Sequence, residues 1–219
     1  MQQLQDWLRF AAAALILCLT AGFAHAQGPG KDFVPLNPPQ PTESGGKVEV
    51  IEFFAYTCPH CHALQPALDS WLKRKPADVA FRRIPVVFQD AMLPFARIYY
   101  TLEAMGLLGK LHQDVFDALH NQRVRLQDPK ALFEWVASKG VDRKKFEDAY
   151  NSFSVQSLTR RAAELTRRYG ISFTPAVVVD GRFLTAPSMT SKGSSVDYPR
   201  FLKVLDQLVA TSRKKVGAK

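Results

Sequence analysis

Apolar residues along the chain follow two different periods, and the changes between them mark its elements. Residues 48–55 are a nearly continuous run of strand formers, which is typical of a strand buried on both faces. Residues 58–75 carry apolar side chains at helical spacing, with Thr57 as the expected cap and Pro59 in the first turn. A second strand is predicted over residues 79–88. This order of strand, helix and strand is typical of an α/β domain.

The middle of the chain is helical in pattern, and strand signals return after it. Five helices are expected, around residues 95–105, 108–119, 128–140, 142–152 and 155–169. Residues 175–179 and 182–185, separated by Asp180-Gly181, predict a hairpin. A polar loop over residues 186–197 and a closing helix over residues 198–211 follow. The late hairpin needs the early strands as partners, so we expect one sheet interrupted by a helical insertion.

The start of the chain differs in character from the rest. An apolar stretch of about fourteen residues, 10–23, follows Arg9 and ends at Ala24-His25-Ala26, the pattern of a secretory signal peptide. The stretch is shorter than the roughly 20 residues that a membrane span requires. We expect export with cleavage after Ala26. Residues 27–47, rich in proline and with Gly45-Gly46, predict an extended leader with a short edge strand near 33–36.

These patterns divide the sequence into five segments. We expect a signal peptide at residues 1–26, the leader at 27–47, a first section of the α/β domain at 48–88, the helical insertion at 89–154 and a second section of the α/β domain at 155–219.

Charge adds little to the functional picture. The 29 lysines and arginines exceed the 20 acidic residues and give a formal net charge of +9. The basic residues are dispersed as pairs and triplets, without one stripe and without interleaved aromatic residues. We therefore do not expect a nucleic-acid partner.

The cysteines narrow the chemistry. Of three cysteines, Cys18 lies in the expected signal peptide, which leaves Cys58 and Cys61. A disulfide scaffold would use more cysteines, spread more widely. Zinc is not expected, because no second ligand pair lies at a useful spacing. A C-x-x-C-H haem box made of Cys58, Cys61 and His62 stays an alternative, although it would need a distal methionine or histidine ligand.

A redox-active dithiol explains the arrangement better. A C-x-x-C pair beside a strand and a helix is typical of thioredoxin-like redox sites. The N-terminus of a helix stabilises an anion, so Cys58 should be the exposed nucleophile with a low pKa. Cys61, a turn further in, should be the buried partner. Pro59 gives a stiff first turn and His60 a donor imidazole, both of which favour the reduced form.

Three further residues are candidates for the site. Glu52 lies on the apolar strand six residues before Cys58, and we expect a buried carboxyl without a partner that exchanges protons with Cys61. The alternative is that Glu52 pairs with a lysine or faces solvent. Glu49, nearer the start of the strand, is expected to be exposed. A cis Thr174-Pro175 bond would place this loop against the thiols, with the backbone of Thr174 free to bind an extended peptide.

The residues Glu-Phe-Phe-Ala-Tyr-Thr-Cys-Pro-His-Cys, followed later by Gly-Ile-Ser-Phe-Thr-Pro-Ala-Val-Val-Val-Asp-Gly, resemble the periplasmic thiol:disulfide oxidases of the DsbA type. The resemblance implies a thioredoxin-like fold with an inserted helical domain and a cis Pro175. It also implies that Cys58 attacks, His60 stabilises the thiolate and Glu52 is the buried acid. A low-pKa cysteine and strong oxidising power are well-known properties of that family. The best-known members have valine where this chain has Thr174.

The resemblance further implies partners and a compartment. We expect a periplasmic monomer that passes its disulfide to reduced exported polypeptides, uses no cofactor beyond the Cys58–Cys61 pair, and is re-oxidised by a quinone-linked inner-membrane protein of the DsbB type. A disulfide isomerase or reductase of the same fold is the nearest alternative, although the leader is short for the dimerisation domain of such relatives. A chaperone or binding module with incidental cysteines is a further one.

Overall fold

The computed structural model describes residues 32–191 and 195–216. The expected signal peptide and the first residues of the expected leader lie outside the described residues. In chain order, the described elements are β1 (Phe33–Pro35), β2 (Val48–Phe54), α2 (Pro59–Arg74), β3 (Val79–Pro85), a 3-10 turn η1 (Asp90–Met92), α3 (Leu93–Ala104), α4 (Leu108–His120), α5 (Pro129–Ser138), α6 (Arg143–Tyr150), α7 (Phe153–Arg168), β4 (Ala176–Val179), β5 (Phe183–Thr185), α8 (Pro187–Thr190) and α9 (Tyr198–Val216).

The strands form one mixed sheet in the order β1-β5-β4-β2-β3. Strands β2 and β3 are parallel, whereas β4 pairs antiparallel with β2 and β5. The predicted edge strand of the leader is confirmed as β1, which pairs with β5. All seven residues of β2 are buried, as its apolar run predicts. Strand β2 has a neighbour on each side, β4 and β3, and the redox pair follows directly after it.

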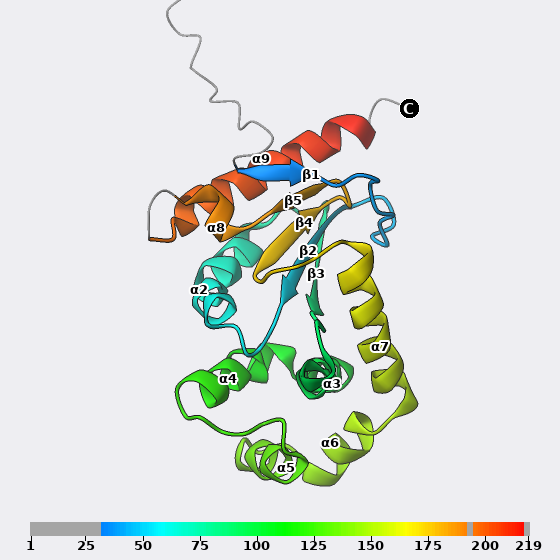
Figure 1. The fold of residues 1–219 in the computed structure, drawn as a ribbon, viewed down its shortest axis with the longest axis vertical. Coiled ribbons are helices and arrows are strands. Elements are labelled where there is room, and N and C mark those ends of the chain that lie inside the picture. Colours follow the sequence, from blue (N-terminus) through cyan, green and yellow to red (C-terminus); the bar gives the residue numbers. More distant parts are fainter. Residues whose placement is uncertain (1–31, 192–194, 217–219) are drawn as a thin grey trace, which may run out of the picture.

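Helices cover both faces of this sheet (Figure 1). Alternate residues of β2 point to opposite faces. Val48 and Val50 pack with Trp71 of α2 and Phe201 of α9 in one core. The other core extends from β2 into α3 to α7 and contains most of the large aromatic side chains. The predicted α/β class with a late hairpin that completes the sheet is confirmed.

Helices α3 to α6 lie beyond one end of the sheet, and α7 returns along its side (Figure 1). Asp128 caps α5 with its side chain, as its position before Pro129 indicates. Ser152 was expected to end the fourth helix, but that helix ends at Tyr150, and the side chain of Ser152 caps α7 instead. The boundaries of the proposed insertion at residues 89–154 stay a prediction.

Three predicted elements differ from the structure. The second strand ends at Pro85 rather than at Phe88, although the amide of Val86 still bonds to the carbonyl of Phe54 at 2.8 Å. The expected polar loop after the hairpin contains the short helix α8, which Pro187 begins. The closing helix continues to Val216, five residues further than expected. Among the described residues, no helix has the length and apolar character needed to cross a membrane.

Candidate active site

The redox pair lies where β2 ends and α2 begins. Cys58 is the N-cap residue of α2, and its sulfur accepts a hydrogen bond from the amide of Cys61 at 3.3 Å. The prediction of Thr57 as the cap is therefore wrong by one residue, because the sulfur itself binds the free amide. Pro59 and His60 begin the helix and are exposed. The two sulfurs differ in access, since Cys58 is half-buried and Cys61 is buried.

The surroundings of the two thiols move their pKa values in opposite directions. The pKa of Cys58 is lowered to about 5, first by a hydrogen bond with the side chain of Cys61, then by the Thr174 side chain and by backbone hydrogen bonds from Cys61 and His60. Partial burial opposes this shift without reversing it. The pKa of Cys61 is raised, mainly by burial and also by its interaction with Cys58. Near neutral pH the anion therefore sits on Cys58 and the proton on Cys61.

His60 affects this balance through its backbone amide, which is one of the groups that lower the pKa of Cys58. The stabilising role expected of its imidazole stays a prediction.

The loop before β4 reaches the nucleophile from across the sequence. The Thr174-Pro175 peptide bond is cis. The carbonyl oxygen of Thr174 lies 3.4 Å from the sulfur of Cys58, although the two residues are 116 positions apart. The structure thus brings Thr174 and Pro175 to the redox pair.

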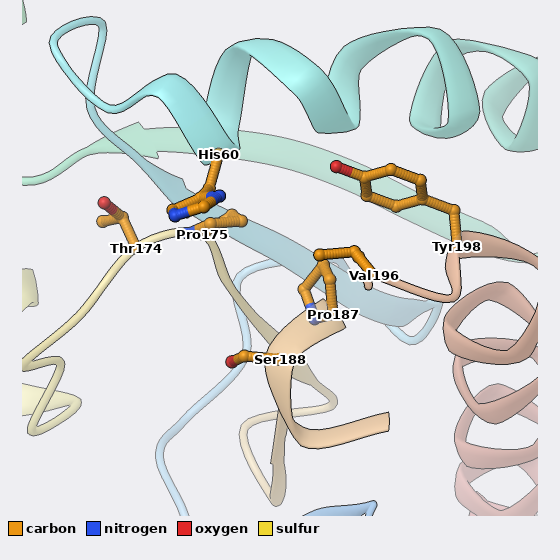
Figure 2. Close-up of a pocket in the computed structure, with 7 residues that line it drawn as sticks. All are labelled: His60, Thr174, Pro175, Pro187, Ser188, Val196 and Tyr198. Carbon is orange, nitrogen blue, oxygen red and sulfur yellow. The ribbon is translucent and has the colours of Figure 1, made fainter. Parts of the chain in front are cut away.

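A small pocket opens beside the nucleophile (Figure 2). It has a volume of about 100 Å³ and a mostly apolar lining, made by His60, Thr174, Pro175, Pro187, Ser188, Val196 and Tyr198. In Figure 2 the ring of Tyr198 extends from the start of α9 toward His60, and Pro187 rises from α8 on the opposite side. Such a pocket can take an apolar side chain of a peptide whose backbone follows Thr174.

Glu52 lies beneath the pair and is fully buried, with 0% of its surface exposed. The expectation of a carboxyl without a partner is wrong. Its Oε2 accepts a hydrogen bond from Arg83 Nε at 2.8 Å, and its Oε1 accepts one from Gln65 Nε2 at 3.1 Å. Burial nevertheless raises the pKa of Glu52 above its ordinary value, and Arg83 only partly offsets this. A buried acid with a raised pKa can hold a proton for its neighbours.

Glu49 contradicts its prediction more plainly, because it is buried with 2% exposure. Its Oε2 accepts a hydrogen bond from Arg82 Nε at 2.9 Å, and its Oε1 accepts one from the amide of Glu43. A strand buried on both faces must bury both acids, so each one requires a cation from the neighbouring strand.

Sequence reasoning missed Gln65, Arg83 and Tyr198. Gln65 uses its whole amide: Nε2 also donates to the carbonyl of Cys61 at 3.2 Å, and Oε1 accepts from Arg83 at 3.1 Å. The sequence did hold one signal for the arginine, since Arg82-Arg83 lies on the second predicted strand, which the structure pairs with β2. Tyr198 gave none, because only the fold places α9 beside the pair.

The haem alternative rested on His62. Its Nε2 lies 2.8 Å from Oδ1 of Asp117 on α4, so the nitrogen that a haem iron would need is already engaged. Within residues 32–191 and 195–216, no cluster of three or more histidine, cysteine or acidic side chains could hold a metal ion.

A C-x-x-C pair with one thiolate and one protonated thiol, at the end of an interior strand and beside a cis-proline loop, defines a thioredoxin-like thiol:disulfide oxidoreductase. The comparisons with known proteins agree. The family described as a DSBA-like thioredoxin domain matches residues 49–192. The thiol:disulfide interchange protein DsbA of Bordetella parapertussis is 46% identical over 204 residues, which cover 93% of this chain and 95% of that protein. DsbA of Pseudomonas aeruginosa PAO1 is 35% identical over 184 residues, covering 84% and 85%.

Solved structures give the same result. The crystal structure of Pseudomonas aeruginosa DsbA has 33% identity and a TM-score of 0.82, and the match covers 89% of this chain and 98% of that one. The oxidoreductase NmDsbA1 from N. meningitidis has 32% identity and a TM-score of 0.75, covering 86% and 95%. The chain belongs to the DsbA family. The predicted family, its thioredoxin-like fold with inserted helices, and protein thiol:disulfide oxidoreductase activity are therefore confirmed.

Proposed function

We propose that the protein works in the oxidising direction and introduces disulfide bonds into exported polypeptides. The observation that carries this proposal is the position of the two sulfurs: that of Cys58 is accessible and accepts a hydrogen bond from the amide of Cys61 at 3.3 Å, whereas that of Cys61 is buried. These surroundings lower the pKa of Cys58 and raise that of Cys61. A thiolate stabilised on Cys58 exists only in the reduced protein, so it favours the dithiol and makes the Cys58–Cys61 disulfide a good electron acceptor.

The reaction follows from the access of the two sulfurs. A thiolate of the polypeptide attacks the accessible sulfur of Cys58, the bond to Cys61 breaks, and a mixed disulfide forms. A second thiolate of the polypeptide then attacks the polypeptide's first sulfur, which is bonded to Cys58 in that mixed disulfide. Cys58 leaves as a thiolate, the polypeptide keeps the new disulfide, and the enzyme keeps both electrons.

The departing Cys61 needs a proton, because burial makes its anion unfavourable. We assign this role to Glu52, whose raised pKa lets it hold a proton inside the sheet. Gln65 supports the assignment, since the same amide nitrogen donates to Glu52 and to the carbonyl of Cys61.

The substrate would bind along the pocket beside the pair. Thr174 offers its backbone to an extended chain, and Pro175 with Tyr198 gives the pocket an apolar wall. Broad specificity follows from this arrangement, because backbone pairing and binding in a small apolar pocket depend little on the amino-acid sequence of the substrate.

The compartment and the partner that restores the disulfide belong to the same proposal. The relatives carry the name thiol:disulfide interchange protein DsbA. We propose a periplasmic location reached through the signal peptide of residues 1–26, no cofactor beyond the Cys58–Cys61 pair, and re-oxidation by a quinone-linked membrane protein of the DsbB type.

Equilibration with glutathione tests the direction of the reaction. We expect reduced glutathione at low excess to reduce the Cys58–Cys61 disulfide, as for an oxidase. A pair that stays oxidised under these conditions would identify a reductase instead. A second assay mixes the oxidised protein with a reduced polypeptide that contains two cysteines, and we expect one disulfide formed per enzyme. If Cys58→Ala forms it equally well, the chaperone reading with incidental cysteines replaces the enzymatic one.

A further inference from the structure

The segment that carries the redox pair is held against α4 at three points. Before the pair, the hydroxyl of Tyr56 lies 2.8 Å from Nδ1 of His112, and the backbone carbonyl of Tyr56 lies 2.8 Å from Nε2 of His120. After the pair, Nε2 of His62 lies 2.8 Å from Oδ1 of Asp117. In Figure 1 the turn between β2 and α2 comes down onto α4. The reaction proposed above uses none of these contacts.

The partners on α4 form one surface. Residues four positions apart lie on the same side of a helix, which brings His112, Phe116 and His120 together. The ring of Phe116 stacks on His62, with centroids 5.5 Å apart, and meets the ring of Tyr56 edge-on at 5.0 Å. We call this surface the α4 clamp; its members are His112, Phe116, Asp117 and His120.

Hydrogen-bond chemistry fixes the protons of the clamp. A carbonyl oxygen can only accept, so Nε2–H of His120 donates to Tyr56. In the same way, Nε2–H of His62 donates to the carboxylate of Asp117. The rings of His62 and His120 stack with centroids 5.2 Å apart, which holds the two donors side by side. Burial keeps the pKa of His112 well below its ordinary value, so that ring is neutral.

We infer that His120 is a positioning residue for Cys58, an inference that rests on the redox function proposed above. The low pKa of Cys58 depends on hydrogen bonds that weaken steeply with distance and angle. The turn before Cys58 is closed by a 3.0 Å hydrogen bond from the amide of Cys58 to the carbonyl of Ala55. Thr57, within this turn, is exposed. The bond from His120 to the Tyr56 carbonyl ties this turn to the inserted helices. The clamp thereby keeps the Cys58 sulfur facing the amide of Cys61.

Removing the donor should therefore change the chemistry of a sulfur that His120 does not touch. In His120→Leu the Tyr56 carbonyl loses its partner and the turn relaxes. We expect the pKa of Cys58 to rise by about half a unit to one unit, and the equilibrium constant for reduction of the disulfide by glutathione to fall about three- to tenfold. His120→Gln keeps an N–H donor, so it should restore both values. The thiolate's ultraviolet absorbance across a pH titration gives the pKa.

Leu119→Ala is the matched control, because Leu119 neighbours His120 on α4 and its side chain packs against the core. It should lower the free energy of unfolding and leave the pKa of Cys58 unchanged. The inference is overturned if His120→Leu leaves that pKa in place, or if Leu119→Ala raises it as much. These readouts use glutathione alone. A wild-type protein that fails to oxidise a polypeptide would refute the proposed function without affecting this result.

Discussion

The amide nitrogen of Cys61 lies 3.3 Å from the sulfur of Cys58, so one cysteine stabilises the anion of the other through its backbone. The helix supplies this donor at no extra cost, because a first-turn amide has no partner within the helix. The thiol of Cys61 meanwhile stays buried and protonated. Attack and departure thus involve two sulfurs whose properties differ although they lie one helical turn apart.

Loss of the buried sulfur should trap the first covalent intermediate. In Cys61→Ala, the thiolate of Cys58 still attacks a disulfide, but no neighbouring thiol can resolve the product. We expect a stable mixed disulfide with oxidised glutathione, visible by mass spectrometry under non-reducing conditions. Cys58→Ala is the control: its remaining thiol is buried with a raised pKa, so it should form no adduct. Equal labelling of the two variants would contradict the assigned roles.

Thr174 should contribute directly to the acidity of the nucleophile. Its side chain is one of the groups that lower the pKa of Cys58. Thr174→Val keeps the shape and removes the hydroxyl, so we expect the pKa of Cys58 to rise by about half a unit to one unit and the protein to become a weaker oxidant. Thr185→Val is the control, because that hydroxyl binds the backbone of Asp32 in the β1–β5 region. A pKa of Cys58 that stays unchanged or falls in Thr174→Val would contradict this contribution of the side chain.

The stability of the reduced protein should depend on pH in one direction. The folded pKa of Cys58 is about 5, against an ordinary value of 9.0. A group whose pKa is lowered by folding contributes stability that is complete at pH values above its ordinary pKa. That stability is lost as the pH falls through its pKa in the folded protein. We expect the melting temperature of the reduced protein to rise relative to that of the oxidised protein between about pH 5 and about pH 9. Scanning calorimetry of both forms measures the difference between their melting temperatures. If the melting temperature of the reduced protein rose relative to that of the oxidised protein on acidification, the low pKa of Cys58 would be refuted.

Arg83 should matter most where Glu52 is ionised. Burial raises the pKa of Glu52 in the folded protein above its ordinary value of 4.5. The stability that this shift contributes is therefore complete below about pH 4.5 and is lost as the pH rises through the folded pKa. Arg83→Met removes the cation that limits this loss. We expect destabilisation of up to about 3 kcal/mol near neutral pH and less in acid, measured by denaturant unfolding.

Two further variants isolate that ion pair. In a Glu52→Gln background, the cost of Arg83→Met should become nearly independent of pH. Arg82→Met is the matched comparison, since Arg82 pairs with Glu49 instead. It should destabilise the fold and leave the rate of disulfide exchange unchanged. A slower exchange in this variant than in Arg83→Met would remove Glu52 from the proposed proton transfer.

The sequence predicted those features that depend on neighbours along the chain. The apolar run of β2, the spacing of Cys58 and Cys61 and the capping of the inserted helices are local signals, and they located the fold and the redox pair. The partners of Glu49 and Glu52 depend instead on the register between β2 and β3, which places Glu52 opposite Arg83. Without that register, a buried acid and an exposed acid have the same pattern in the sequence.

Other parts of the site needed the complete fold. Helix α8 has only four residues, too few to show a helical period, so its sequence resembles a polar loop. Tyr198 joins the pocket because α9 packs beside α2. The histidines of the α4 clamp are spaced eight residues apart on a helix that was predicted, but nothing local shows which element that face meets.

The distance in sequence between Cys58 and Thr174 has a consequence for biosynthesis. A ribosome completes the two cysteines long before it reaches Thr174, 116 residues later, or β4, which borders β2 in the sheet. A partly synthesised chain therefore carries thiols that lack one of their acidifying neighbours and the framework that orients them. The contact between Cys58 and Thr174 therefore forms only once the last third of the polypeptide is present.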